Sequence, residues 1–214
     1  MRPLLLCLFL SLLGGCNETR FESPIGMQSN PCDPRWKGLW VGPDPDDRDT
    51  ALYVDSDCRL SVLDVATEEK SARRVELRVE FAHVDDRDYL IVDDASLRDL
   101  FTFKPPFAID PPPPHTYSYV RYRIDGDTLN FDLVDSERVA QLVIDGTLQG
   151  TVSKTSGELH VFVQGDAGKM LDTIRTQPVF GEGARAHSTR LVRSSLTLRE
   201  FERQLQRKVA RKSP

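Results

Sequence analysis

The chain has few of the residues from which enzymes build metal or nucleophilic sites. Its 214 residues include only four histidines, at positions 83, 115, 160 and 187, and none falls at the His-x-x-x-His spacing of a metal site. A Gly-x-Ser-x-Gly elbow, a phosphate-binding loop and a dinucleotide fingerprint are all missing. These absences predict a protein without metal, cofactor or enzymatic activity. A catalytic pair of carboxylates that only the fold brings together would have no local signature, so the sequence does not exclude one.

Long apolar runs are also rare. Residues 4–13 form one, and ten residues are too few to span a bilayer. Arg2 precedes this run and small residues follow it, so residues 1–15 have the basic, apolar and small-residue regions of a secretory signal peptide. No second apolar stretch approaches membrane-spanning length, and we therefore expect the rest of the chain to be a water-soluble domain.

The end of this run, Leu13-Gly14-Gly15-Cys16, resembles the lipobox of bacterial lipoproteins. The resemblance implies that the Cys16 thiol carries a diacylglycerol and that acyl chains such as palmitate anchor the protein. Asn17 follows, rather than the Asp that lipoproteins use as an inner-membrane retention signal. This implies an outer-membrane protein whose domain faces the periplasm. An ordinary signal peptide that ends near a cysteine is the alternative.

Cysteine is scarce as well, with four in the chain. Cys7 would leave with the signal peptide and Cys16 would be consumed by lipid. Cys32 and Cys58 would then remain in an oxidising compartment, where a disulfide is expected. Such a bond closes a loop of about 26 residues and stabilises the fold by roughly 3 kcal/mol. Two free thiols or a metal-binding pair are the alternatives.

Charge is distributed unevenly along the chain. From Cys16 to Ala184 there are 18 Lys and Arg against 31 Asp and Glu, a net charge of −13. From Arg185 to the end there are 9 against 2, a net charge of +7. This asymmetry predicts either an acidic body neutralised by its own basic tail, or two surfaces with different partners.

Beyond the signal peptide the sequence divides into three parts. Residues 16–35 are polar and aperiodic, which predicts a lipidated cysteine and a tether. Residues 36–195 contain short β-branched and aromatic runs separated by turn residues, which predicts an all-β domain. Residues 196–214 have a helical period and begin with the capping-box pair Thr197 and Glu200. We expect a basic amphipathic helix that docks its apolar stripe on the domain. A partner site for anionic surfaces, such as lipid headgroups, is the alternative. The stripe consists of Leu198, Phe201, Leu205 and Val209.

The β domain is predicted to be antiparallel. Residues 75–81 and 129–133 alternate apolar and polar side chains, as strands with one buried face do. Asp125-Gly126 is a strong signal for a two-residue hairpin turn. The predicted strands are 37–42, 50–56, 58–65, 75–84, 88–93, 116–124, 128–134, 140–152, 158–164 and 187–194.

Gly38-Leu39-Trp40 resembles the Gly-x-Trp signature in the first strand of lipocalins and related calycin barrels. Arg190 and Arg193, in the last predicted strand, are similar to the arginine that packs across that Trp, and a helix follows as it does in the family. The resemblance implies an antiparallel up-and-down β-barrel with a C-terminal helix. Trp40 would close its base, with Arg190 or Arg193 over the ring in a cation–π contact. A β-sandwich is the alternative architecture.

A proline-rich segment, residues 104–114, cannot be a central strand because consecutive prolines fix φ and remove backbone donors. Long loops of this kind are often functional, and aromatic residues surround this one. We therefore predict a non-catalytic binding domain for a small apolar or lipid-like ligand held by the barrel. The candidate ligand-binding residues are Phe101, Phe103, Phe107, Tyr117 and Tyr119.

The acidic body favours a second class of function. Its charge would steer a cationic protein toward it. The alternative is thus an acidic periplasmic inhibitor or immunity protein that binds a basic envelope protein, such as a cationic cell-wall hydrolase or toxin. Nucleic acid is a poor partner because the acidic body would repel it.

Overall fold

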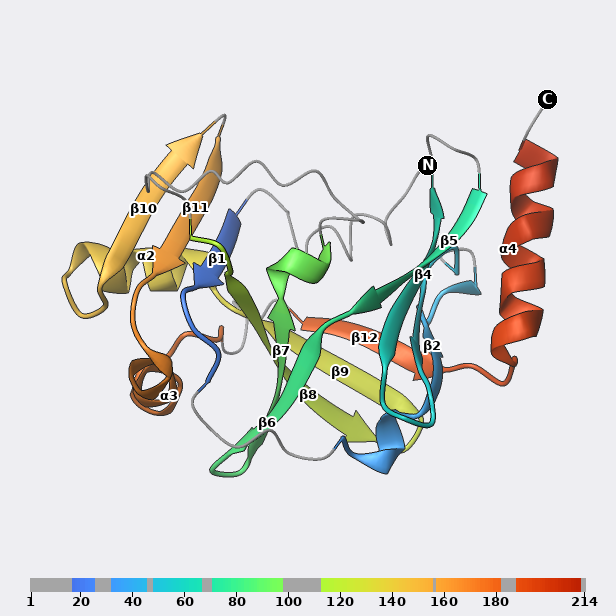
Figure 1. Cartoon of the computed structure of the whole chain (residues 1–214), viewed down its shortest axis with the longest axis horizontal. Coiled ribbons are helices and arrows are strands. Elements are labelled where there is room, and N and C mark those ends of the chain that lie inside the picture. The colour runs from blue at the N-terminus through green and yellow to red at the C-terminus, as the bar shows by residue number, and fades with distance from the viewer. Residues whose placement is uncertain are drawn as a thin grey trace.

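The structure is a computed structural model that describes residues 17–25, 32–45, 48–66, 71–97, 113–155, 157–181 and 188–212 (Figure 1). This part of the chain contains 12 strands in one mixed, mostly antiparallel sheet, together with three α-helices. The predicted mainly β class is confirmed. Among the described helices, none is both long enough and apolar enough to cross a membrane.

Most elements succeed one another as hairpins. The strands are β1 (Asn17–Phe21), β2 (Gly38–Val41), β3 (Ala51–Val54), β4 (Leu60–Ala66), β5 (Ser71–Leu77), β6 (Val79–Val84), β7 (Arg87–Asp93), β8 (Tyr117–Asp125), β9 (Thr128–Leu133), β10 (Gly150–Thr155), β11 (Glu158–Val163) and β12 (Ser188–Arg193). The α-helices are α2 (Ser136–Ile144), α3 (Ala167–Thr176) and α4 (Leu198–Lys212), and the short 3-10 helices are η1 (Pro34–Trp36) and η3 (Asp94–Leu97).

The sheet is assembled from two antiparallel series. Strands β2 to β5 pair in sequence, strands β6 to β9 do the same, and β12 lies between β9 and β2. Only Arg78 separates β5 from β6, and there the strand exchanges its neighbour β4 for β7. The hydrogen-bond ladders of the described residues do not close into a ring, and they fit the alternative of a β-sandwich.

The expected tether is wrong for residues 17–21, because they form strand β1 inside the sheet. β1 pairs in parallel with β11 and meets β8 through Phe21 and Tyr117. Its side chains are buried on both faces: Phe21 is fully buried, and so is the polar Arg20. A polar segment can be a central strand when its charges find partners, and here they do.

Residues 140–152, predicted as one strand, include the end of α2 and the start of β10. Asp135 caps α2 by accepting the Arg138 N–H at 3.0 Å, and Gly146 follows the helix with φ 75°. The same cap begins α3, which the sequence did not predict. Short apolar runs suit a buried helix face as well as a strand, so periodicity alone misassigned them.

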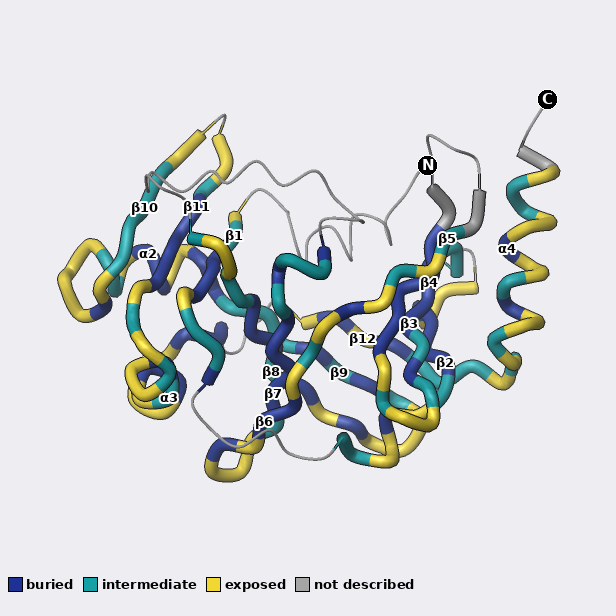
Figure 2. The backbone as a smooth tube through the Cα atoms, viewed as in Figure 1, coloured by how far each residue is buried: buried dark blue, intermediate teal, exposed yellow. Residues whose placement is uncertain are grey.

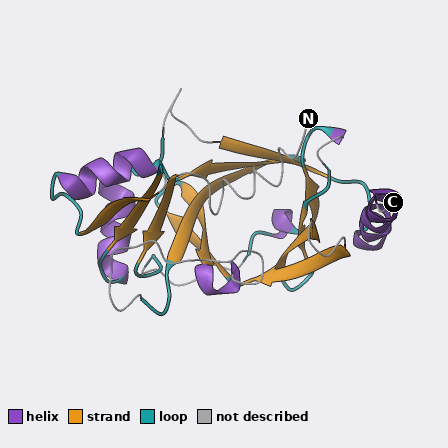
Figure 3. Ribbon diagram, turned by 90° about the horizontal axis from the view of Figure 1, so that it is seen from above, coloured by secondary structure: helices purple, strands orange, loops and turns teal. Residues whose placement is uncertain are grey.

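Three hydrophobic clusters hold these elements together, and buried positions follow the strands in Figure 2. The first contains Trp36 and Trp40. It fills the space between strands β2–β5 on one side and strands β6–β9 and β12 on the other. The second lies beneath α2 and α3, and the third beneath α4. Seen from above, α2 and α3 lie at one end of the sheet and α4 lies at the other (Figure 3).

The predicted disulfide between Cys32 and Cys58 is confirmed, with Cα atoms 6.0 Å apart. Cys32 precedes η1, and Cys58 precedes β4 in a turn where its φ is 64°. The disulfide therefore links the segment before η1 and β2 to the β3–β4 hairpin. It restricts the unfolded chain and thereby stabilises the folded one.

Helix α4 is docked on the outer face of the sheet. Phe201 and Leu205 are buried against Leu39 and Val41 of β2 and Leu63 of β4. The helix begins with the expected capping box, since the Thr197 N–H donates to Glu200 at 2.8 Å and the Glu200 N–H donates to Thr197 at 3.3 Å. The Thr197 hydroxyl also donates to the Glu200 carboxylate at 2.7 Å, and this bond and the one from the Thr197 N–H lower the pKa of that carboxyl.

Docking of α4 predicts a large stability loss on truncation of its buried face. Phe201→Ala should lower the free energy of unfolding by about 3–5 kcal/mol, because it removes a ring from a packed contact. Ile144→Ala is the matched control, since Ile144 is 66% exposed and its loss should cost no more than about 0.5 kcal/mol. Urea unfolding measures both; equal midpoints for the two variants would contradict the docked helix.

Candidate functional site

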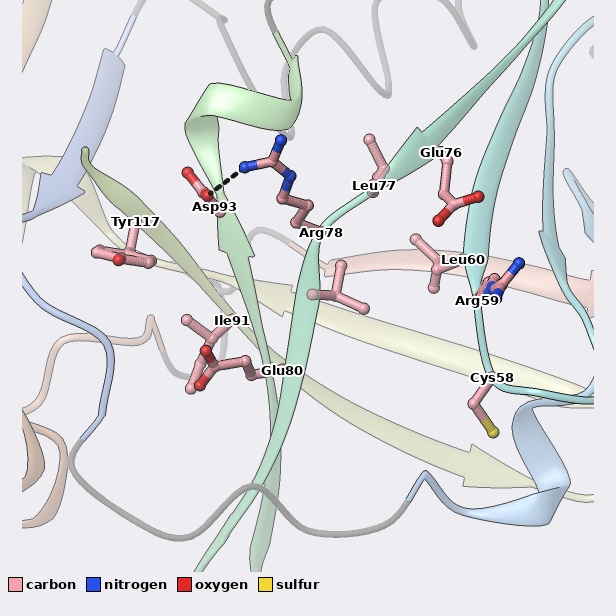
Figure 4. A pocket seen from close by; sticks show the side chains of 11 residues that line it. Cys58, Arg59, Leu60, Glu76, Leu77, Arg78, Glu80, Ile91, Asp93 and Tyr117 are labelled. Atoms are coloured by element: carbon pink, nitrogen blue, oxygen red, sulfur yellow. Dashed lines mark ion pairs between the residues drawn. The ribbon is translucent and has the colours of Figure 1, made fainter. Parts of the chain in front are cut away.

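A groove with a volume of about 400 Å³ lies over the junction of β5 and β6 (Figure 4). This volume falls within the range of sites that bind small molecules. Residues from five strands and a turn line it, so it depends on the fold and not on one segment. The lining consists of Cys58, Arg59, Leu60, Glu76, Leu77, Arg78, Val79, Glu80, Ile91, Asp93 and Tyr117.

The exchange of neighbouring strands at Arg78 explains where the groove lies. Leu77 is opposite Leu60 of β4, whereas Val79 is opposite Val92 of β7. The Asp93 N–H donates to the Arg78 carbonyl at 3.0 Å and ends the second ladder. Each half of the strand thus has a ladder to only one neighbour, and the sheet is incomplete on either side of the junction.

The groove combines an apolar floor with charged side chains. Leu60 and Leu77 belong to the first core cluster and Ile91 to the second, so the floor joins two cores. Five charged residues surround it, and the carboxylates outnumber the arginines. The five are Arg59, Arg78, Glu76, Glu80 and Asp93.

The Arg78 side chain at the rim is loosely held. Arg78 and Asp93 are 3.9 Å apart, and the Arg78 side chain is 74% exposed. An ion pair with this geometry and exposure contributes little to stability. The Arg78 guanidinium can therefore turn toward a ligand at small cost, whereas Asp93 is held in place by the Ala95 N–H at 2.9 Å. The excess of carboxylate favours a ligand with a positive group.

Of the predicted ligand-binding residues, Tyr117 lines the groove. Burial raises the pKa of the Tyr117 phenol, and the Asp93 carboxylate raises it further, so the hydroxyl is neutral and can donate a hydrogen bond. Tyr119 lies elsewhere: it stacks on Phe21 with ring centroids 4.0 Å apart and donates to the Ser23 carbonyl. The remaining candidates, Phe101, Phe103 and Phe107, lie outside the described residues, as do Cys16 and the proline-rich segment 104–112.

Arg193 lies over the Trp40 ring, with its guanidinium carbon 4.2 Å from the ring centroid. The same guanidinium donates to the carbonyls of Lys37 at 2.5 Å and Arg35 at 2.7 Å. Of the two arginines named from the sequence, Arg193 thus makes the cation–π contact. Arg190 is exposed on β12.

Glycine is required at the first position of the Gly38-Leu39-Trp40 motif. Gly38 has φ 122°, and a Cβ atom there would lie 2.9 Å from the Arg193 Nη1. A side chain would therefore strain the backbone and displace the arginine. The motif and the arginine are two parts of one contact.

A buried charge cluster, which the sequence analysis missed, joins β1 to β8 and η3. Arg20 lies 2.9 Å from Glu18 and 3.2 Å from Asp94, and all three side chains are at most 10% exposed. Ser118 donates to Asp94 at 2.8 Å, and Arg20 donates to Ser118. No pattern in residues 17–25 predicts the cluster, because the partners of Arg20 on η3 and β8 lie more than 70 residues away in the sequence.

Two further contacts complete this cluster. The Thr116 hydroxyl donates to Asp94 at 2.7 Å, and a His160 ring nitrogen lies 3.0 Å from Glu18. Burial raises the pKa of the Asp94 carboxyl, and the Arg20 guanidinium opposes that rise. The cluster is a structural tie that holds β1 in place.

Within the described residues, no three or more His, Cys, Asp or Glu side chains are grouped as metal ligands. Comparison with protein-family models, curated proteins and solved structures finds no match for this chain.

The cluster predicts a pH-dependent effect of removing its cation. Arg20→Met removes the cation that faces the buried Asp94 and Glu18 carboxylates and should cost about 3–5 kcal/mol of unfolding free energy at neutral pH. Because the pKa of Asp94 is raised in the folded state, that state takes up a proton before the unfolded chain does as the pH falls. Part of the lost stability should therefore return in acid.

Urea unfolding of Arg20→Met at neutral and acidic pH measures this effect. Arg175→Met is the control: its ion pair with Asp85 spans 3.5 Å between exposed side chains, and its loss should cost at most about 1 kcal/mol. A loss in Arg20→Met that is the same at both pH values would show that no buried charge is being relieved.

Proposed function

We propose that the protein is a lipid-anchored envelope protein whose β domain binds a small amphiphilic molecule in the groove over the β5–β6 junction, without catalysing a reaction. The observation that carries this proposal is the groove itself, with its volume of about 400 Å³, its apolar floor and its charged rim. An apolar floor stabilises a hydrocarbon group by excluding water, while a few polar groups fix the orientation of the ligand.

The rim narrows the class of ligand. Glu76, Glu80 and Asp93 surround the apolar floor together with Arg59 and Arg78. A zwitterionic head with a cationic group satisfies both signs of charge, whereas a purely anionic head meets more carboxylates than arginines. The preferred ligand is thus a single-chain, zwitterionic, lipid-like molecule.

A calycin-like barrel is part of the same proposal. When β5 and β6 are counted as one strand interrupted at Arg78, every strand in the series β2, β3, β4, β5–β6, β7, β8, β9 and β12 has two antiparallel neighbours. The contact of Arg193 with Trp40 and the helix after β12 support this interpretation. The groove then lies at an interruption in the barrel wall.

The lipid anchor rests on the Leu13-Gly14-Gly15-Cys16 ending and the apolar run before it. With β1 beginning at Asn17, the lipidated residue would adjoin the folded domain directly. The proposed location is the periplasmic side of the bacterial outer membrane.

Ligand binding is tested with dodecylphosphocholine, a zwitterionic single-chain amphiphile, kept below its micelle concentration in calorimetric titrations. The chain should bind it saturably and prefer it to laurate, which carries only a negative head. Glu80→Trp should weaken binding about tenfold or more, because Glu80 is an exposed residue of the lining and an indole there fills the groove.

Glu137→Trp is the matched control, because Glu137 is an exposed carboxylate on α2, away from the groove. It should bind dodecylphosphocholine as the parent chain does. Absence of saturable binding, or equal affinities for the two tryptophan variants, would refute the groove as the ligand site.

The anchor is tested separately by replacing the cysteine of the lipobox-like ending. Cys16→Ser removes the thiol that would accept the diacylglycerol and should release the protein from the membrane fraction of bacterial cells. Cys7→Ser is the control and should leave the fractionation unchanged. A Cys16→Ser variant that still sediments with outer membranes would exclude lipid on Cys16 as the anchor.

A further inference from the structure

Three arginines form a line along the outer face of α4. Arg199, Arg203 and Arg207 follow one another at intervals of four residues, so they lie on one side of the helix, about 6 Å apart along its axis. All three are exposed, while Phe201 and Leu205 face the sheet. The sequence places a fourth arginine, Arg211, at the next interval.

This line is electrostatically unfavourable in the isolated protein. Like charges four residues apart on a helix repel one another and destabilise it. The acidic body relieves little of this repulsion: among the ion pairs of the described residues, only Lys208 with Asp49, at 2.6 Å, links α4 to the rest of the domain. Within the described residues, the three arginines of the line form no ion pair with the acidic body.

The fold adds positive charge beside the helix. Strand β5 lies near α4, and its exposed Arg74 lies over the Tyr53 ring at 5.2 Å, on the sheet face that α4 covers. Residues 203–212 contain five Lys and Arg and no acidic residue. A protein with a net charge of −5 thus presents a concentrated basic surface at one end of its sheet.

We propose that this face of α4 binds anionic phospholipid headgroups, and that it fixes the orientation of the domain on the membrane. The choice of a membrane rests in part on the proposed lipid anchor at Cys16. The start of β1 and the C-terminal end of α4 point to the same side of the molecule, the upper side in Figure 1. A membrane surface on that side would meet a lipid before Asn17 and the C-terminal end of α4, so that Arg207 would lie nearest to it of the three arginines.

The physical logic is that of two attachment signals. The diacylglycerol proposed on Cys16 anchors the protein, and a basic patch adds about 1 kcal/mol for each Lys or Arg near an anionic surface. The helix need not insert, because its apolar stripe is already occupied by the sheet. Binding is consequently electrostatic and weakens as salt screens the charges.

The test uses the full chain with Cys16→Ser, so that lipid on this residue plays no part. Partition is measured into vesicles of phosphatidylcholine alone, and into vesicles in which a third of that lipid is replaced by phosphatidylglycerol. The ratio of the two partition coefficients cancels any apolar binding common to both. It should exceed one at low salt and fall toward one at high salt.

A double variant, Arg203→Gln with Arg207→Gln, should lower this ratio about 30-fold, the effect of two basic residues near the surface. Its matched control, Arg123→Gln with Arg138→Gln, removes the same charge from exposed positions on β8 and α2 and should leave the ratio nearly unchanged. An equal partition of the parent chain into both vesicles, as expected if the face binds an acidic protein instead, overturns the proposal. So does an unchanged ratio in the Arg203/Arg207 variant. Because Cys16 is replaced throughout, the outcome is independent of whether the cysteine is lipidated.

Discussion

The contact between Arg193 and Trp40 is the interaction on which the arrangement of the sheet depends. Strand β12 enters between β9 and β2, but its ladder to β2 consists of only two residue pairs, Val192 with Val41 and Arg193 with Trp40. The Arg193 side chain extends this short ladder by hydrogen bonds to two carbonyls beside η1 and by its cover over the indole. The Arg193 side chain thereby joins β12 to η1 and the start of β2, and Gly38 leaves the space that this side chain occupies.

The groove arises because this sheet is joined at one side and interrupted at the other. A strand that exchanges neighbours within one residue leaves each half with only one ladder, and buried side chains of both cores line the groove at the junction. Irregularities in sheets are often found beside binding sites, since they expose groups that a regular ladder would cover. The two arginines and three carboxylates of the lining lie at this irregularity.

Charge has two opposite roles in the molecule. In the Arg20 cluster, buried groups of both signs satisfy one another and bind β1 to segments distant in sequence. On α4, groups of one sign are left to solvent, although the rest of the chain carries an excess of acid. Burial forces charges to pair because an isolated charge in a core is costly, whereas solvent tolerates a repulsive arrangement that a partner can relieve.

Local sequence determined what local chemistry controls. The Asp125-Gly126 turn, the alternation in residues 75–81 and the capping box of Thr197 and Glu200 were predicted because each depends on neighbouring residues. The pairing of Cys32 with Cys58 was predicted from the expectation of an oxidising compartment. Tertiary structure alone decided that residues 17–21 are a strand, since Arg20 tolerates burial only beside Asp94 and Ser118. It also decided which arginine covers Trp40, that α2 replaces an expected strand, and that the groove exists at all. These features depend on which distant segments of the chain come into contact. A pattern of apolar and polar residues predicts that a residue is buried, but not which residues it packs against.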